Sequence, residues 1–146
     1  MRLTNVADNV FITQIPCSTR HLETVRRFVE DHAREARLSP AAVEECKLAA
    51  DEACTNVMKH AYGCDSAKKI EVAVIVDRDR FTVRIRDEGL PFRAELYREP
   101  DVARALKQRR RGGLGVHIMR SMMDEVTYHK HGRVNEVHLT KYRNGE

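Results

Sequence analysis

The 146 residues are enough for one domain with a single hydrophobic core. Hydrophobic residues make up 42% and charged residues 33%, a globular balance that excludes an intrinsically disordered chain. No apolar run is long enough to span a bilayer and the N-terminus has no secretory pattern, so we expect a soluble cytoplasmic protein without a membrane partner. The net charge of +4 is modest and aromatic residues are only 5%, which disfavours direct nucleic-acid binding.

The first half of the chain predicts a strand followed by two helices. Residues 8–16 alternate as a strand. Ser18 or Thr19 can cap a helix whose apolar residues recur at helical spacing: Leu22, Val25, Val29, Ala33 and Ala36. Ser39-Pro40 predicts the start of a second helix, which runs to about residue 61 and has its own apolar stripe: Val43, Cys46, Ala50, Ala53 and Val57.

The second half predicts four strands in two hairpins, at residues 69–77 and 80–87 and at 125–130 and 133–142. Between the hairpins, residues 88–113 form a long irregular loop of the kind that often serves as a lid, and a helix follows at 114–123. This order predicts helices packed on one face of a mixed, mainly antiparallel sheet, a two-layer α/β sandwich, with residues 1–146 as a single domain.

The four cysteines, Cys17, Cys46, Cys54 and Cys64, form neither a C-x-x-C pair nor a zinc-finger spacing. Cys46 and Cys54 are about 12 Å apart along a predicted helix, too far for a disulfide. We therefore expect reduced thiols, at least two of them packed in the core.

Three clusters of residues suit a chemical role, and the first lies on the second helix. A four-residue step places Glu52 and Asn56 one above the other, beside the apolar stripe rather than opposite it, and the same step leads on to His60. A carboxylate stacked on an amide oxygen suits a general base beside a ligand for a hard cation. A solvated glutamate with an ordinary helix asparagine is the alternative.

The second cluster is Asp87, Gly89 and Pro91 at the end of a predicted strand. Asp87 shares one strand face with three apolar residues, Phe81, Val83 and Ile85. If this is the core side, the carboxylate reaches the edge of a buried layer and needs a donor, for which the exocyclic amine of adenine is suitable. Gly89 would let such a ligand approach the backbone. A plain turn is the alternative.

The third cluster is the basic and glycine-rich run from Lys107 to Gly115, just before a predicted helix. Glycines there expose the unpaired N–H groups of the helix, whose dipole favours an anion. Three arginines upstream suit bidentate contacts to phosphate: Arg109, Arg110 and Arg111. The run is neither a P-loop nor a dinucleotide-binding fingerprint, and a solvated basic segment is the alternative.

Together the clusters resemble the N, G1 and G2 boxes of the GHKL (Bergerat-type) ATP-binding fold, in the same order. Within that fold the chain most closely resembles the serine-protein kinases that act as anti-sigma factors in bacterial partner-switching systems. The resemblance covers roughly residues 8–142 and is carried by three patterns: Glu52-x-x-x-Asn56-x-x-x-His60, Asp87-x-Gly89-x-Pro91 and Gly112-Gly113-Leu114-Gly115.

The resemblance implies a role for each matching residue. It implies that Glu52 activates the attacking hydroxyl, that Asn56 coordinates Mg²⁺, and that Asp87 hydrogen-bonds adenine with Gly89 against the base. It implies a mobile lid over about residues 93–112, from which one of Arg109, Arg110 and Arg111 contacts the terminal phosphate. The remaining ATP-binding positions that it implies are His60, Pro91, Gly112, Gly113, Leu114, Gly115 and Val116.

One position departs from the family pattern, which usually has a threonine near the last strand that supports the adenine site. Asn135 stands there in this chain. It shares its strand face with Val137 and Leu139, which indicates that Asn135 can replace the threonine as a polar partner for Asp87.

Two functions remain open from the sequence. The first is an ATP- and Mg²⁺-dependent serine/threonine-protein kinase that phosphorylates an anti-anti-sigma (STAS-type) antagonist and sequesters a sigma factor or an equivalent regulator. The second is a nucleotide-gated binding module with little or no transfer activity. Glu52 and Asn56 favour the kinase, because a pure binder needs no base. The family commonly forms homodimers through the sheet region, an expectation that extends to this chain.

A histidine-kinase fragment is disfavoured, because the chain has no space for a helix pair with a phosphoaccepting histidine. His129 and His131 alternate on one strand face in the manner of a metal-binding pair. We interpret them as surface residues, because such two-residue matches are common by chance.

Overall fold

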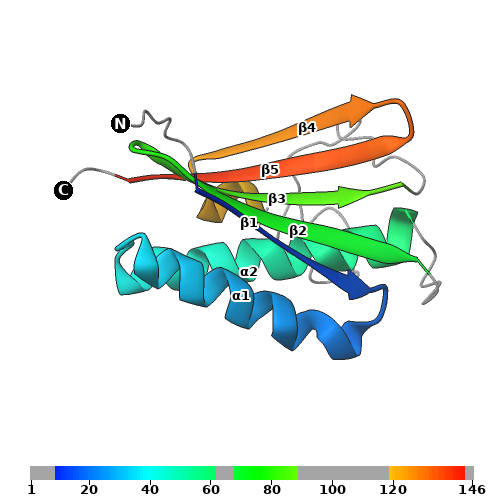
Figure 1. Ribbon diagram of the computed structural model, residues 1–146, viewed down its shortest axis with the longest axis horizontal. Helices are drawn as coiled ribbons and strands as arrows, with labels where there is room; N and C mark the ends of the chain where they lie inside the picture. The colour runs from blue at the N-terminus through cyan, green and yellow to red at the C-terminus, as the bar shows by residue number, and fades with distance from the viewer. Residues whose placement is uncertain (1–8, 62–67, 89–118, 144–146) are drawn as a thin grey trace, which may run out of the picture.

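The computed structural model describes residues 9–61, 68–88 and 119–143, the side chains of residues 60 and 61 excepted. It has two layers, a five-stranded sheet and two helices that cover one face of it (Figure 1). The helices are α1 (Leu22–Glu35) and α2 (Pro40–Asn56). The strands are β1 (Asn9–Pro16), β2 (Lys69–Val76), β3 (Arg80–Asp87), β4 (Glu125–His131) and β5 (Val134–Tyr142). The predicted two-layer α/β class is confirmed.

The sheet has the order β1-β2-β3-β5-β4, and its four pairings are all antiparallel. We predicted a mixed, mainly antiparallel sheet, but the described strands contain no parallel pair. The reason lies in the connection from β1 to β2, which contains two helices. The chain runs back along α1 and forward again along α2, so β2 enters the sheet opposite in direction to β1 (Figure 1).

Side-chain caps begin the 3₁₀ turn that leads into α1 and the helix α2, whereas His21, the N-cap residue of α1 itself, forms no side-chain cap. Ser18 accepts a hydrogen bond from the backbone N–H of Arg20 at 3.4 Å, and a short 3₁₀ turn, η1 (Thr19–His21), precedes α1. Ser39 accepts from the N–H of Ala42 at 3.1 Å, with Pro40 as the first residue of α2. The predicted cap of α2 is thus confirmed. α2 continues directly into a π-helical segment, η2 (Val57–Ala61), so helical structure extends to residue 61, the last described residue before a gap.

The core lies between the two helices and the inner face of the sheet. All residues of both predicted helix stripes are buried. From the sheet, Phe81, Val83 and Ile85 of β3 and Leu139 of β5 are at most 1% exposed. The parity of the strands therefore fixes which β3 and β5 side chains face α2. Their neighbours in sequence lie on the outer face, which no helix covers within the described part of the chain (Figure 1).

The two hairpins also form close to the predicted bounds. β2 and β3 are joined by a turn in which Asp77 Oδ1 accepts from the N–H groups of Asp79 and Arg80, each at 2.8 Å. β4 and β5 are joined at Gly132, whose φ of +62° is a conformation that favours glycine. Of the helix predicted at 114–123, the described part at residues 119–122 is helical, and the predicted lid at 93–112 lies outside the described residues. No described helix is long and apolar enough to cross a membrane.

Three of the four cysteines have the predicted state. Cys17, Cys46 and Cys54 are free thiols and at most 2% exposed, whereas Cys64 lies outside the described residues. Burial raises the pKa of the Cys46 thiol to about 12, and it raises the pKa of Cys54 as well. Both thiols are therefore protonated at neutral pH and act as small apolar side chains.

This burial predicts that Cys46 and Cys54 resist thiol reagents in the folded protein. In a variant that carries Cys17→Ser and Cys64→Ser, we expect reaction with Ellman's reagent at pH 8 to be at least about 1,000-fold slower than for a free thiol, because so little thiolate forms. Unfolding in guanidinium should release two reactive thiols per chain. Fast labelling of the folded variant would contradict this placement of the two cysteines.

Candidate nucleotide-binding site

One wall of the candidate site is the C-terminal part of α2. Glu52 and Asn56 lie one helical step apart, and both are half-buried. They lie beside fully buried neighbours, Ala53 and Cys54, so they occupy the edge of the helix–sheet contact as predicted. A carboxylate and an amide oxygen are thus held next to each other at the border between core and solvent.

The π-helical segment η2 begins immediately after Asn56. A π-helix widens the backbone, and such segments are frequently found at functional sites. It places Asn56 at a break in the regular α-helical hydrogen bonding rather than within an unbroken helix. His60 lies inside η2, and its side chain is outside the described part.

The other wall is the end of β3, where Asp87 faces inward. It continues the buried face of Phe81, Val83 and Ile85, and it is itself only 8% exposed. The predicted parity of Asp87 is therefore confirmed, and a plain exposed turn is excluded for this residue. A carboxylate so placed needs hydrogen-bond donors.

Asn135 supplies such a donor from β5. It lies directly opposite Asp87 in the β3–β5 pairing, and its Nδ2 donates to Asp87 Oδ1 at 3.0 Å. The prediction that Asn135 is a polar partner of Asp87 is confirmed in its geometry. An ionised carboxylate has about four acceptor sites, and the hydrogen bond from Asn135 occupies one of them.

Several predicted site residues lie outside the described part of the chain. They are Gly89, Pro91, Arg109, Arg110, Arg111, Gly112, Gly113, Leu114, Gly115 and Val116. Among the described residues, Glu52 and Asn56 on α2 and Asp87 and Asn135 on β3 and β5 lie on the same side of the sheet.

The opposite side of the sheet carries a charged network that the sequence did not predict. Arg86 Nε donates to Glu136 Oε2 at 2.5 Å, and Arg86 Nη1 donates to Glu71 Oε1 at 3.3 Å. His138 Nε2 lies 2.7 Å from the other oxygen of Glu136. The alternation of strand residues could have placed all four side chains on the outer face. It does not show that these side chains pair with one another. We call these four residues the outer-face brace.

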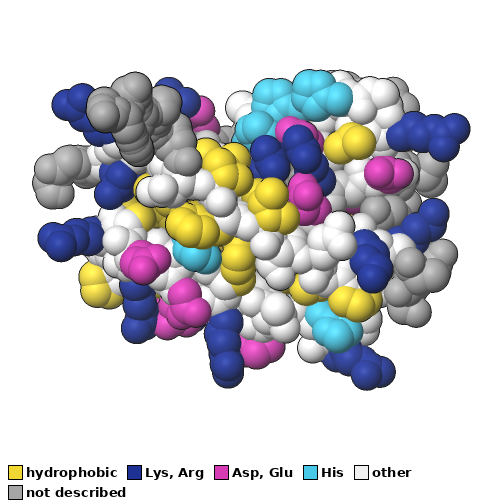
Figure 2. Space-filling model, in the orientation of Figure 1, with side chains coloured by type: hydrophobic (Ala, Val, Ile, Leu, Met, Phe, Trp, Pro, Cys, Tyr) yellow, Lys and Arg dark blue, Asp and Glu magenta, His cyan; other side chains and the backbone are white. Residues whose placement is uncertain are grey.

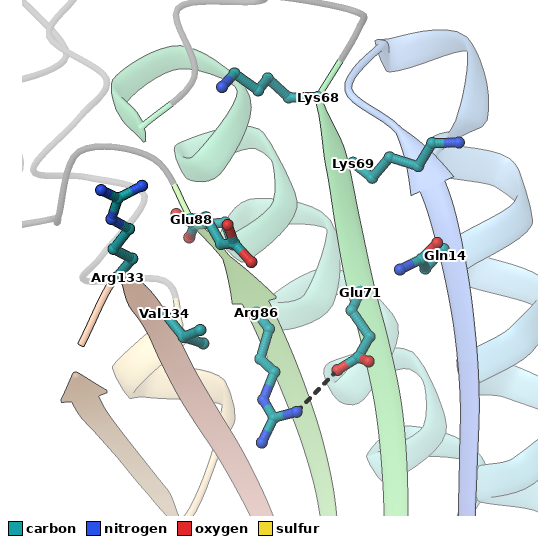
Figure 3. A pocket seen from close by; sticks show the side chains of 9 residues that line it. Gln14, Lys68, Lys69, Glu71, Arg86, Glu88, Arg133 and Val134 are labelled. Atoms are coloured by element: carbon teal, nitrogen blue, oxygen red, sulfur yellow. Dashed lines mark hydrogen bonds and ion pairs between the residues drawn. The ribbon is translucent and has the colours of Figure 1, made fainter. Parts of the chain in front are cut away.

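A groove of about 500 Å³ lies beside the brace on the outer face. Figure 3 shows Gln14, Glu71 and Arg86 in front of the sheet, with the helices behind it. The groove is thus on the far side of the sheet from Glu52 and Asn56. It is lined mainly by charged and polar residues: Gln14, Lys68, Lys69, Glu71, Arg86, Asp87, Glu88, Arg133 and Val134.

The histidines of β4 and β5 also lie on the outer face. The rings of His129 and His131 stack with centroids 6.4 Å apart, and the His129 and His138 centroids are 4.4 Å apart. Figure 2 shows histidine side chains gathered at the β4 and β5 side of the molecule. His129 and His131 are exposed, and the described residues contain no group of three His, Cys, Asp or Glu residues at metal-binding spacing. Our interpretation of this pair as surface residues is consistent with both observations.

Glu136 has an unusual electrostatic environment for a residue on an open sheet face. Burial opposes its ionisation, but the hydrogen bonds from His138 and Arg86 outweigh burial and lower the pKa of Glu136 to about 2. Its side chain is only 4% exposed. The carboxylate is therefore charged throughout the physiological pH range.

The depressed pKa predicts an acid-sensitive contribution to stability. Glu136 protonates near its ordinary value of 4.5 in the unfolded chain but near 2 in the folded one, so its stabilisation is present above about pH 4.5 and is lost as the pH falls towards 2. The loss is at most about 3 kcal/mol. We therefore expect the free energies of unfolding of wild type and Glu136→Gln, measured in urea at pH 7, 5, 4 and 3, to approach each other as the pH falls. A difference in unfolding free energy that does not change with pH would contradict the lowered pKa of Glu136.

Comparison with known proteins defines the class of this fold and site. The family model of the histidine kinase-like ATPase domain matches residues 15–141, a range that contains α1, α2, β2, β3, β4 and nearly all of β5. Among solved structures, the RsbU and RsbW domains of a Mycobacterium tuberculosis protein superpose with a TM-score of 0.65 over 94% of this chain, at 15% identity. The chain spans 34% of that longer protein, and this likeness shows the fold alone.

Comparison with curated proteins narrows the class. The serine-protein kinase RsbW of Bacillus subtilis is 31% identical over 138 residues, which cover 91% of this chain and 85% of that protein. The serine-protein kinase RsbW of Listeria monocytogenes is 31% identical over 135 residues, with 90% and 85% covered. The chain belongs to the histidine kinase-like ATPase domain family and, within it, to the RsbW serine-protein kinases. It is a protein kinase that uses ATP.

Proposed function

We propose that this kinase transfers the γ-phosphoryl group of ATP to a serine or threonine of an anti-anti-sigma antagonist with a STAS-type domain. In the same switch it sequesters a sigma factor or an equivalent regulator, and phosphorylation of the antagonist determines which partner is held. The observation that carries this proposal is the pair of walls on the helix side of the sheet. Asp87 with Asn135 suits the purine end, and Glu52 with Asn56 suits the phosphate end.

The proposed division of labour follows from the chemistry of phosphoryl transfer, in which the protein positions the groups and neutralises charge. Glu52 accepts the proton of the attacking hydroxyl. Asp87 accepts a hydrogen bond from the exocyclic amine of adenine, while Asn135 Nδ2 donates a second hydrogen bond to the same carboxylate. Gly89 and the glycines Gly113 and Gly115 let the nucleotide approach the backbone.

The residues of α2 fit a magnesium ion. Mg²⁺ prefers oxygen ligands and usually takes only one or two from the protein, the rest coming from water and phosphates. The amide oxygen of Asn56 at the half-buried end of α2 fits this requirement, and Glu52 one turn away adds negative potential. When bound, the ion would neutralise charge on the phosphate oxygens.

Asn56→Ala tests this metal assignment. The variant removes the oxygen ligand, so we expect the affinity for ATP measured with Mg²⁺ to fall by about tenfold or more, whereas the affinity measured in EDTA changes little. Calorimetry under both conditions measures the two affinities. Equal Mg-ATP affinity in wild type and variant would remove Asn56 from the metal site.

The kinase reaction itself is tested with γ-³²P-ATP and a STAS-domain antagonist. We expect label on a serine or threonine of the antagonist, and much slower labelling when Glu52 is replaced by glutamine. Tight ATP binding without any transfer would instead support a nucleotide-gated binding module.

Homodimer formation through the sheet remains a prediction. The outer face of the edge strand β1 carries Val10 and Ile12, which are 50% and 55% exposed. Such apolar side chains are suited to a contact with a second copy. Sedimentation velocity of the purified protein measures the oligomeric state directly.

A further inference from the structure

The outer-face brace connects three neighbouring strands at the end of the sheet where Asp87 lies. Glu71 belongs to β2, Arg86 to β3, and Glu136 and His138 to β5. Figure 3 shows Arg86 reaching across the outer face to Glu71. On its other side the same guanidinium holds Glu136 at 2.5 Å. Arg86 thus joins β3 to both of its neighbours.

The central carboxylate of the brace has a fixed position. Arg86 binds one oxygen of Glu136 and His138 the other, and the Glu136 side chain is 4% exposed. A buried carboxylate with both oxygens engaged cannot rotate without losing a charged partner, and such losses are costly. The neighbouring outer-face side chains are Arg84, which lies 3.8 Å from Glu71, and His129, whose ring centroid lies 4.4 Å from that of His138.

The brace is one residue away from the candidate adenine contact. Arg86 pairs with Glu136, and the next pair along the same two strands is Asp87 with Asn135. Because strand side chains alternate, the first pair lies on the outer face and the second on the inner face. The described β3–β5 pairing ends at Asp87 and Asn135, and the ends of a ladder are where strands separate most easily. The ion pair therefore holds the two strands together where Asp87 and Asn135 must keep their 3.0 Å contact.

We propose that Glu136, acting through Arg86, is a positioning residue that fixes Asp87 for recognition of the adenine amine from the opposite face of the sheet. The brace thereby contributes to the preference for ATP over purine nucleotides that lack this amine. This inference rests on the proposed function. It assigns a role in nucleotide selection to side chains that never contact the nucleotide.

The test uses two nucleotides that differ at one position of the base. Inosine triphosphate has the triphosphate and ribose of ATP, but an oxygen acceptor replaces the exocyclic amine, so the hydrogen bond from that amine to Asp87 is lost. For wild type we expect ATP to bind about 10- to 100-fold more tightly than inosine triphosphate, as for a hydrogen bond to a charged group. In Glu136→Gln we expect this ratio to fall by about fivefold or more, while the Kd of inosine triphosphate changes by less than about twofold.

The ratio separates positioning from general destabilisation. Loss of folded structure would lower the affinity for both nucleotides alike, whereas a displaced Asp87 lowers only the affinity for ATP, which carries the amine. A matched control is Thr140→Val, because Thr140 Oγ1 lies 3.3 Å from Thr82 Oγ1 between the same two strands, on the same face but away from Asp87. This control should keep the wild-type ratio. Arg86→Lys, which keeps the charge but removes the Nε donor, provides a second variant with the same expected loss.

Three results would overturn the inference, and they are distinguishable. Wild-type affinities for both nucleotides in Glu136→Gln and in Arg86→Lys would show that the brace does not position Asp87. An equal loss of affinity for ATP and for inosine triphosphate would show that the brace affects only the stability of the fold. If wild type itself does not prefer ATP, the proposed adenine site at Asp87 is wrong, and the inference fails with it.

Discussion

Replacing Glu52 with glutamine is expected to slow phosphoryl transfer by about 100- to 10,000-fold, the usual contribution of a general base. Glutamine keeps the size and the half-buried position on α2 but cannot accept the proton of the attacking hydroxyl. The affinity for ATP should stay within about twofold, because the proposed nucleotide contacts lie at Asp87 and Asn56. Single-turnover transfer to the antagonist and calorimetry with ATP measure the two effects separately.

A second glutamate on α2 provides the matched control. Glu44 lies on the same helix, but it is exposed and forms an ion pair with Lys47 at 3.2 Å. Glu44→Gln removes a carboxylate from α2 without touching the candidate site, so transfer should stay at the wild-type rate. If Glu52→Gln also retained wild-type transfer, another group would have to be the base.

Replacing Asp87 with asparagine should weaken ATP binding by about 10- to 100-fold. The change removes the charge that accepts the adenine amine and puts a second amide opposite Asn135, whose Nδ2 now donates to Asp87 Oδ1 at 3.0 Å. Asp87 is 8% exposed, so water cannot readily replace the lost acceptor. Competition against a fluorescent ATP analogue measures the affinity of each variant.

Two checks make the Asp87 result interpretable. Asp31→Asn removes a carboxylate from the exposed face of α1 and should leave ATP affinity unchanged. Thermal unfolding of Asp87→Asn shows whether the folded state persists at the assay temperature. A folded variant with wild-type ATP affinity would mean that adenine is recognised elsewhere.

The parts of the site that could be predicted are those fixed by strand parity and helix spacing. Asp87 follows Phe81, Val83 and Ile85 at alternate positions, so burial of those apolar residues forces the carboxylate inward. The same argument from Val137 and Leu139 places Asn135 opposite it. Helical spacing likewise places Glu52 and Asn56 at the border of the buried stripe.

Other features depend on contacts that periodicity does not encode. The π-helical segment after Asn56 arises within a sequence that continues an ordinary helical pattern, so only the tertiary structure reveals it. Glu136 has the parity of a solvated side chain, yet it is buried because Arg86 and His138 cover it. The sheet was expected to be mixed, whereas the described strands pair only antiparallel, because the strand order β1-β2-β3-β5-β4 is set by tertiary pairing rather than by the pattern of any one strand.

The most direct test of the whole account is a crystal structure with Mg²⁺ and a non-hydrolysable ATP analogue. We expect the adenine amine within hydrogen-bond distance of the Asp87 carboxylate and the metal ion on the amide oxygen of Asn56, with Glu52 facing the γ-phosphate. A nucleotide that contacts neither Asp87 nor Asn56 would contradict the assignment of both walls.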